Sequence, residues 1–128
     1  MKLVLVFLLA ASPSFAEPMT GDEFEAYVTG KTLDFSTDGE VYGREEYLPN
    51  RRVRWAFAGD KCMNGFWYER APREICFIYD DSIDEHCWYY RATPDGMMAD
   101  FLNEPGGPAV HADESDTGLF CPGPDVGV

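Results

Sequence analysis

The apolar residues that follow Thr20 recur with a helical period. Thr20 and Glu23 have the spacing of a capping box, in which the Thr20 hydroxyl accepts a hydrogen bond from the Glu23 amide. An apolar stripe at i, i+3 and i+4 spacing begins at Phe24, and Gly30 supplies a residue that readily adopts the left-handed conformation at a helix end. The pattern predicts one short amphipathic helix over residues 21–29, which needs an apolar surface to pack against.

After this helix the apolar positions alternate with polar ones, as in β-strands. Runs of this kind, separated by turn sequences such as Thr93–Gly96, cover residues 32–36, 41–48, 52–57, 62–68, 75–79, 87–91 and 97–102. A bulge is expected in the fourth run, at Asn64–Gly65. The pattern predicts an all-β domain with one short N-terminal α-helix, in which an antiparallel meander closes as a small barrel or folds as a sandwich.

The two ends of the chain differ from this central region. Residues 1–16 have the parts of a signal peptide, namely Lys2, an apolar run, and small residues up to Ala16. The run is too short to span a membrane, and no cysteine directly follows it to carry a lipid, so no membrane anchor is expected. We expect a helix-plus-β domain over residues 17–103 and a Pro/Gly-rich C-terminal tail over residues 104–128. The protein is predicted to be periplasmic or secreted.

Charge narrows the choice of partners. The chain has 10 Lys and Arg residues against 23 Asp and Glu residues, a net charge of −13 that becomes −14 when the signal peptide and its Lys2 are removed. Such a protein is repelled by nucleic acid phosphates and by anionic membrane surfaces, and it favours a basic partner or cations. No nucleic acid partner is therefore expected.

Four cysteines in an exported chain predict two disulfides. Residues 74–91 are expected to form a hairpin. A turn centred between Asp81 and Ser82 places Cys76 opposite Cys87, at a separation that a disulfide accepts. The same register pairs Ile75 with Trp88 on the other face. Both faces are apolar, so we expect both to be covered, one by the core and the other by the helix, the tail, a bound ligand or a partner, of which the helix or tail is favoured.

The remaining pair is then Cys62 with Cys121, which would attach the tail to the domain. The alternative pair of Cys62 with Cys76 fits less well, because a turn near Ala71–Pro72 would place Trp67 opposite Cys76.

No motif in the chain dictates a reaction. The cysteines are assigned to disulfides, and no G-x-S-x-G sequence provides a nucleophile. The acidic turn from Asp80 to His86 resembles the start of a calcium loop but lacks its later ligands, and a second acidic cluster surrounds His111. Both are interpreted as solvated loops. The sequence predicts no catalytic residue, no metal site and no cofactor.

The candidate binding residues are mostly aromatic. Core packing accounts for many of these rings, but Trp, Tyr and Arg also dominate recognition surfaces, and an arginine can bind an anion. The candidates are Trp55, Trp67, Trp88, Tyr68, Tyr90 and Arg52.

A neighbouring arginine has a structural explanation. The turn at Pro49–Asn50 places either Glu45 or Glu46 opposite Arg54, depending on its register. Either register predicts a cross-strand ion pair on a solvent-facing strand.

A set of short motifs resembles a group of small exported proteobacterial proteins of unknown function. The motifs are Gly30-Lys31-Thr32, Tyr47-x-Pro49, Cys62-x-x-Gly65-x-Trp67, Cys76-Phe77-x-Tyr79 and Cys87-Trp88. The resemblance spans residues 20–90 and implies the disulfide hairpin, with no activity attached. In size, compartment and charge sign the chain is also similar to periplasmic inhibitors of lysozyme, although it lacks their Ser-Gly-rich segment ending in Lys/Arg-Tyr.

These observations favour an exported, non-enzymatic binding domain that presents an aromatic surface to a protein or small-molecule ligand. One alternative is an acidic periplasmic inhibitor of a basic secreted hydrolase, in which the negative charge steers association. Another is a small hydrolase that uses paired carboxylates.

Overall fold

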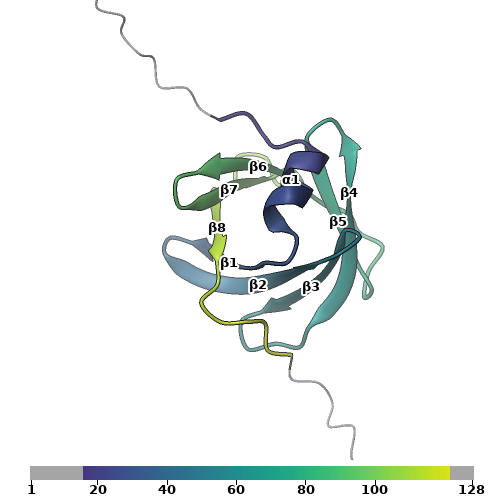
Figure 1. Cartoon of the computed structure of the whole chain (residues 1–128), viewed down its shortest axis with the longest axis vertical. Coiled ribbons are helices and arrows are strands. Elements are labelled where there is room, and N and C mark those ends of the chain that lie inside the picture. The colour runs from purple at the N-terminus through teal and green to yellow at the C-terminus, as the bar shows by residue number, and fades with distance from the viewer. Residues whose placement is uncertain (1–15, 122–128) are drawn as a thin grey trace, which may run out of the picture.

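The computed structural model describes residues 16–121, so that the predicted signal peptide up to residue 15 and the last seven residues lie outside the described part. The elements are α1 (Gly21–Val28), β1 (Thr32–Thr37), β2 (Glu40–Leu48), β3 (Arg52–Phe57), β4 (Met63–Ala71), β5 (Glu74–Tyr79), β6 (His86–Thr93), β7 (Gly96–Phe101) and β8 (Val110–Glu114). Each strand pairs with the next and β8 pairs with β1, which closes an antiparallel barrel (Figure 1). The prediction of an all-β fold with one N-terminal helix is confirmed, and of the two predicted architectures the protein has the barrel.

The final strand was not predicted. Residues 110–114 were assigned to the tail, but they form β8, which pairs with β7 through Val110 and with β1 through Ala112. Both side chains are buried, whereas the residues between and after them are exposed. This strand contains only two inward residues and follows a Pro/Gly-rich loop. Two residues are too few to establish the alternating pattern that predicts a strand. It removes the two open edges that β1 and β7 would otherwise expose.

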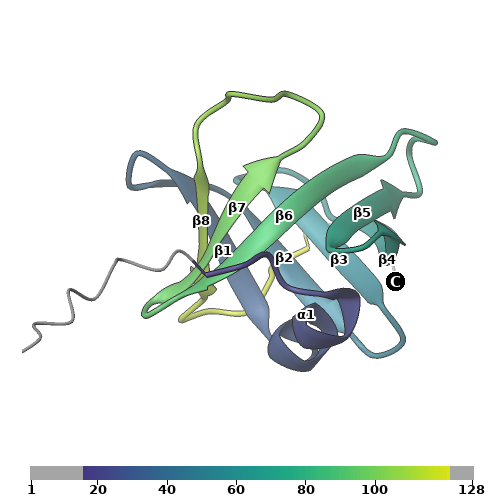
Figure 2. The same cartoon turned by 90° about the horizontal axis from the view of Figure 1, so that it is seen from above.

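Helix α1 closes one end of the barrel. The capping box forms as predicted, with the Thr20 hydroxyl accepting from the Glu23 amide at 3.2 Å, and Gly30 ends the segment with a positive φ of 85°. Figure 2 shows α1 at the end opposite the β7–β8 loop. The start of the helix is fixed to β4, where the carboxylate of Glu69 accepts from the Gly21 amide at 2.9 Å.

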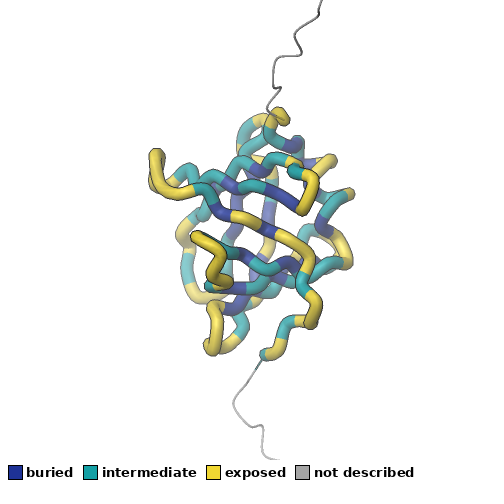
Figure 3. Tube along the Cα trace, turned by 90° about the vertical axis from the view of Figure 1, so that its left-hand side faces the viewer, coloured by how far each residue is buried: buried dark blue, intermediate teal, exposed yellow. Residues whose placement is uncertain are grey.

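The core at the helix end is built around Phe24, which has no exposed surface. Its ring stacks on Tyr90 with the centroids 4.5 Å apart and meets the edge of Trp67 at 5.0 Å. Rings of Tyr47 and Phe77 complete this cluster. The core occupies the inside of the barrel, because buried and exposed positions alternate along the strands (Figure 3).

The two disulfides join the predicted pairs, Cys62 with Cys121 and Cys76 with Cys87. The hairpin register is also the predicted one, with Cys76 opposite Cys87. The residue opposite Cys76 on β4 is Tyr68 and not Trp67, because the turn comprises Pro72 and Arg73, later than predicted, and the β4–β5 pairing then shifts between Glu69 and Ala71. Disulfides are typical of proteins outside the cytoplasm.

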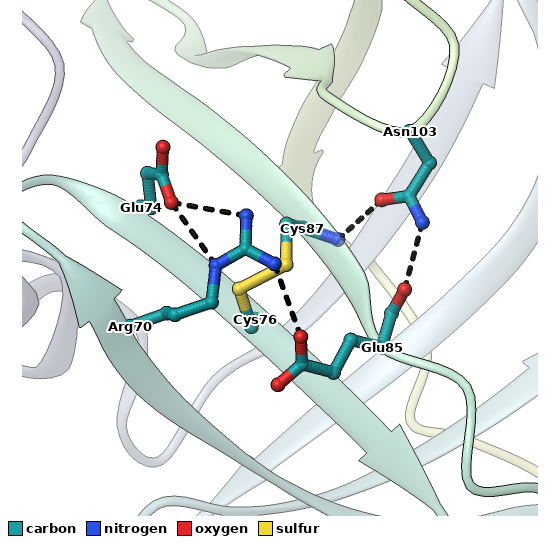
Figure 4. The surroundings of a disulfide bond; sticks show 6 residues. All are labelled: Arg70, Glu74, Cys76, Glu85, Cys87 and Asn103. Atoms are coloured by element: carbon teal, nitrogen blue, oxygen red, sulfur yellow. Dashed lines mark hydrogen bonds and ion pairs between the residues drawn. A yellow bond between two sulfur atoms is a disulfide. The ribbon is translucent and has the colours of Figure 1, made fainter.

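The outer face of the hairpin is covered by polar groups, contrary to the expectation of a helix or tail. Arg70 reaches across the Cys76–Cys87 disulfide to the carboxylates of Glu74 and Glu85, each at 3.0 Å (Figure 4). Asn103 accepts from the Cys87 amide at 2.9 Å and donates to the Glu85 carbonyl at 2.8 Å. Within the described residues, no helix is both long and apolar enough to cross a membrane.

Candidate functional site

The end of the barrel away from α1 contains a cavity of about 520 Å³. This volume lies in the range of small-molecule sites, and eight-stranded barrels are wide enough to hold one small ligand. Most of the wall consists of rings, contributed by Phe35, Tyr42, Trp55, Phe57, Phe77, Tyr79, Trp88, Tyr90 and Phe101. The helix-end core forms its floor, because Phe77 and Tyr90 contact both the cavity and the ring of Phe24.

Two glycines keep this half of the barrel open. A Cβ atom on Gly43 would lie 2.3 Å from the ring of Trp55, and a Cβ atom on Gly65 would lie 2.7 Å from Cδ1 of Tyr79. The absence of side chains at these inward positions therefore gives the two rings their room. The bulge predicted at Asn64–Gly65 is wrong, since Gly65 pairs in regular register with Val53 and with Tyr79.

A bulge does occur in β2, and it brings Tyr42 into the wall. Phe35 pairs with Gly43 and Ser36 pairs with Val41, so that Tyr42 has no partner on β1. The extra residue changes which side chains of β2 point into the barrel. Tyr42 therefore lines the cavity beside Trp55, with the ring centroids 6.1 Å apart. Burial raises the pKa of Tyr42 to about 12, so its hydroxyl is neutral at physiological pH.

Glu45 is the one buried charged side chain among the described residues, with 2% of its surface exposed. The Tyr79 hydroxyl donates a hydrogen bond of 2.6 Å to its Oε2 atom. Burial raises the pKa of Glu45 to about 8 despite this hydrogen bond, so that the carboxyl group holds a proton at neutral pH. A carboxylic acid inside a ring-lined cavity can donate a hydrogen bond to a ligand or, once ionised, balance a positive charge.

The inward position of Glu45 was not predicted, because the sequence left two registers open for the turn after β2. The structure places Glu46, not Glu45, opposite Arg54, and Glu45 lies opposite the inward residue Trp55. Residues 49–51 all lie in the turn, and Asn50 and Arg51 both have positive φ values, of 63° and 59°. The signal in the sequence was the position of Glu45, two residues before Tyr47 on the same strand. Side chains at this spacing lie on one face, and the Tyr47 ring belongs to the core.

Three of the predicted binding residues meet at the cavity. Trp55, Trp88 and Tyr90 line it, but they do so from inside the barrel, so the predicted aromatic surface is an interior wall. Trp67 does not belong to the site. It is 2% exposed and packs in the helix-end core, with the Arg51 guanidinium 4.5 Å above its ring.

The other two candidates lie on the outside of the barrel. Tyr68 follows the inward Trp67 on β4 and is half-buried beside Phe66, and Arg52 is exposed on β3. Arg54 forms no ion pair with any described residue, so the predicted cross-strand ion pair is absent even though the register brings Glu46 opposite it.

The mouth of the cavity is acidic. Asp81, Ser82, Asp84 and His86, from the β5–β6 loop and the start of β6, line it, and Ser82 Oγ accepts from the Asp84 amide at 3.0 Å. In the part of the chain that the structure describes, no group of three or more His, Cys, Asp or Glu side chains is arranged to hold a metal ion. The disulfide from Cys76 to Cys87 ties the two strands that carry this loop.

No family model, no curated protein and no solved structure matches the chain. The functional interpretation therefore depends on the cavity itself, namely on its volume, its rings, and the single carboxyl group buried in its wall.

Proposed function

We propose that the protein is a non-enzymatic binding protein that works outside the cytoplasm, in the periplasm or after secretion, and holds one small ligand inside the barrel. The observation that carries this proposal is the cavity of about 520 Å³, which is lined by side chains from β1 to β7, with rings from every one of these strands except β4. A cavity of this size and composition suits a ligand with an apolar body.

The arrangement of the closed and open ends supports this function. The ring of Phe24 seals the floor, so a ligand enters and leaves through the mouth formed by the β5–β6 loop. Both disulfides fix segments near that mouth, because Cys62 lies in the β3–β4 connection and Cys87 at the start of β6. A cavity held open before binding loses less entropy when a ligand is ordered in it.

Tryptophan emission gives a direct test, because the three tryptophans are divided between the site and the core. Trp55 and Trp88 line the cavity, and Trp67 does not. Titration with a neutral apolar compound, neopentylbenzene, is expected to shift the emission of the oxidised protein. A variant with Trp55→Phe and Trp88→Phe retains only Trp67 and is expected to bind without this shift.

The control is Phe66→Ala, which removes an exposed ring from the outer face of β4 and should leave the titration unchanged. Binding without an emission change can be followed by equilibrium dialysis. The proposal is refuted if neopentylbenzene and longer apolar compounds do not bind, or if the variant that retains only Trp67 gives the same spectral response as the wild type.

A further inference from the structure

We propose that the ligand of this cavity is a small organic cation with an apolar body, and that Glu45 is its counter-ion. The inference rests on the proposed function, since it names the chemical class of ligand for the same cavity. Three features lead to it: the charges of the lining, the buried carboxyl group of Glu45, and the rings around it.

The lining contains acids and no Lys or Arg. Its ionisable side chains apart from tyrosines are Glu45 within the barrel and Asp81, Asp84 and His86 at the mouth. An anionic ligand would have to pass the two aspartates and then meet a carboxyl group with no basic partner. The charge pattern therefore excludes anions and attracts cations, in agreement with the net charge of −13.

The carboxyl group of Glu45 is buried in the wall with tyrosine hydroxyls as its neighbours. Within residues 16–121 its Oε2 atom accepts a hydrogen bond from the Tyr79 hydroxyl at 2.6 Å. The buried hydroxyl of Tyr47, two residues further along the same face, lies close enough to lower the pKa of Glu45, but it has no hydrogen bond of good geometry among the described residues. Buried polar groups are nearly always hydrogen-bonded, so an acid and a hydroxyl without a basic partner are the polar groups that a ligand in this cavity would use.

The rings near Glu45 suit a cation. Trp55 lies opposite Glu45 on the neighbouring strand, and the rings of Tyr42 and Phe57 lie 6.1 and 5.3 Å from the Trp55 ring. Aromatic faces attract ammonium groups, and cages of several rings bind quaternary ammonium ligands. A neutral ligand would use the same rings but would gain nothing from the carboxyl group's charge.

Binding of a permanent cation should be coupled to loss of a proton. The pKa of Glu45 is about 8 in the empty cavity, and the other groups that face it, the tyrosines at positions 42, 47, 79 and 90, have pKa values raised above 10 by burial. His86, Asp81 and Asp84 lie at the mouth. A cation that pairs with the ionised Glu45 therefore releases one proton below about pH 8, and its apparent Kd should fall roughly tenfold per pH unit up to that pH.

The experiment compares two probes of the same shape. Benzyltrimethylammonium carries a permanent charge, and neopentylbenzene has a carbon atom in place of the nitrogen. Dissociation constants are measured for both between pH 6 and 9 by calorimetry or Trp emission. We expect the cation to bind more tightly than its neutral analogue at pH 8, with the tenfold dependence per pH unit below that pH and none for the neutral compound.

Two variants complete the test. Glu45→Gln should abolish the pH dependence and weaken cation binding at pH 8 at least tenfold, while leaving neopentylbenzene binding unchanged. Glu46→Gln, at the adjacent outward position, should behave as the wild type. The inference is overturned if the neutral analogue binds as tightly as the cation at pH 8, or if wild-type cation binding does not change with pH; the proposed function survives those results. If neither probe binds, both proposals fall.

Discussion

Replacement of Glu45 by glutamine is predicted to remove most of the pH dependence of folding stability between pH 5 and 8. The carboxyl group is 2% exposed and accepts one hydrogen bond from Tyr79. Its pKa rises from the ordinary value of 4.5 to about 8 in the folded state, because burial disfavours the charged form. In the unfolded chain the same group is solvated and titrates at its ordinary value.

The sign and size of the effect follow from this difference. Between pH 4.5 and 8 the folded protein binds one proton more than the unfolded chain does, so the free energy of unfolding falls as the pH rises. The stabilisation is fully present below pH 4.5 and is lost as the pH passes through about 8. The slope is about 1.4 kcal/mol per pH unit, so that roughly 3 kcal/mol is lost between pH 5 and 7.5.

The assay is urea unfolding of the oxidised protein at pH 5, 6, 7 and 8, without reductant. Carboxylates with lowered pKa values, such as Glu23 and Glu69, contribute below this window and are present in both proteins. We expect Glu45→Gln to match the wild type at pH 5 and to be the more stable protein at pH 8, whereas Glu46→Gln keeps the wild-type slope. If wild type and Glu45→Gln lose stability in parallel, Glu45 is not a buried acid and the reasoning is wrong.

Three further predictions concern the barrel. Phe24→Ala should lower the free energy of unfolding by about 3–5 kcal/mol, measured by urea denaturation, because it empties the centre of the helix-end core. Gly43→Ala should lower it by about 1–3 kcal/mol and alter the near-UV circular dichroism, because the new methyl group meets the ring of Trp55 at 2.3 Å. Joint replacement of Cys62 and Cys121 by serine should cost about 4 kcal/mol in thermal or urea unfolding, from the loop of 59 residues that the disulfide closes; an unchanged midpoint would contradict this.

Local patterns were sufficient to predict most of the fold. The capping box and the terminal glycine delimit α1, and a symmetric hairpin with two cysteines at matching positions determines both its own register and the remaining disulfide. Local patterns could not predict that the sheet closes into a barrel. Whether strands form a barrel or a sandwich depends on which strand pairs with β1, and that strand, β8, has only two inward residues, Val110 and Ala112.

The candidate site was harder to predict for a related reason. Trp55 and Trp88 were identified by residue type, but the sequence could not show that both line one interior space. That space depends on Gly43 and Gly65, whose roles are visible only when the rings opposite them are placed. Glu45 was not identified because the sequence left the register of the turn at Pro49–Asn50 open, and a shift of one residue reverses the face on which a side chain is expected.

The same features that form the cavity also weaken the fold, and this supports a selected role for them. Glycines in strand interiors reduce packing and add chain entropy to the unfolded state, and a buried acid loses stability at neutral pH. A barrel optimised only for stability would carry an apolar residue at position 45. The chain instead retains the open space and the carboxyl group, and it adds a helix that seals one end and disulfides near the other. Local violations of good packing that converge on one cavity are the expected mark of a binding site.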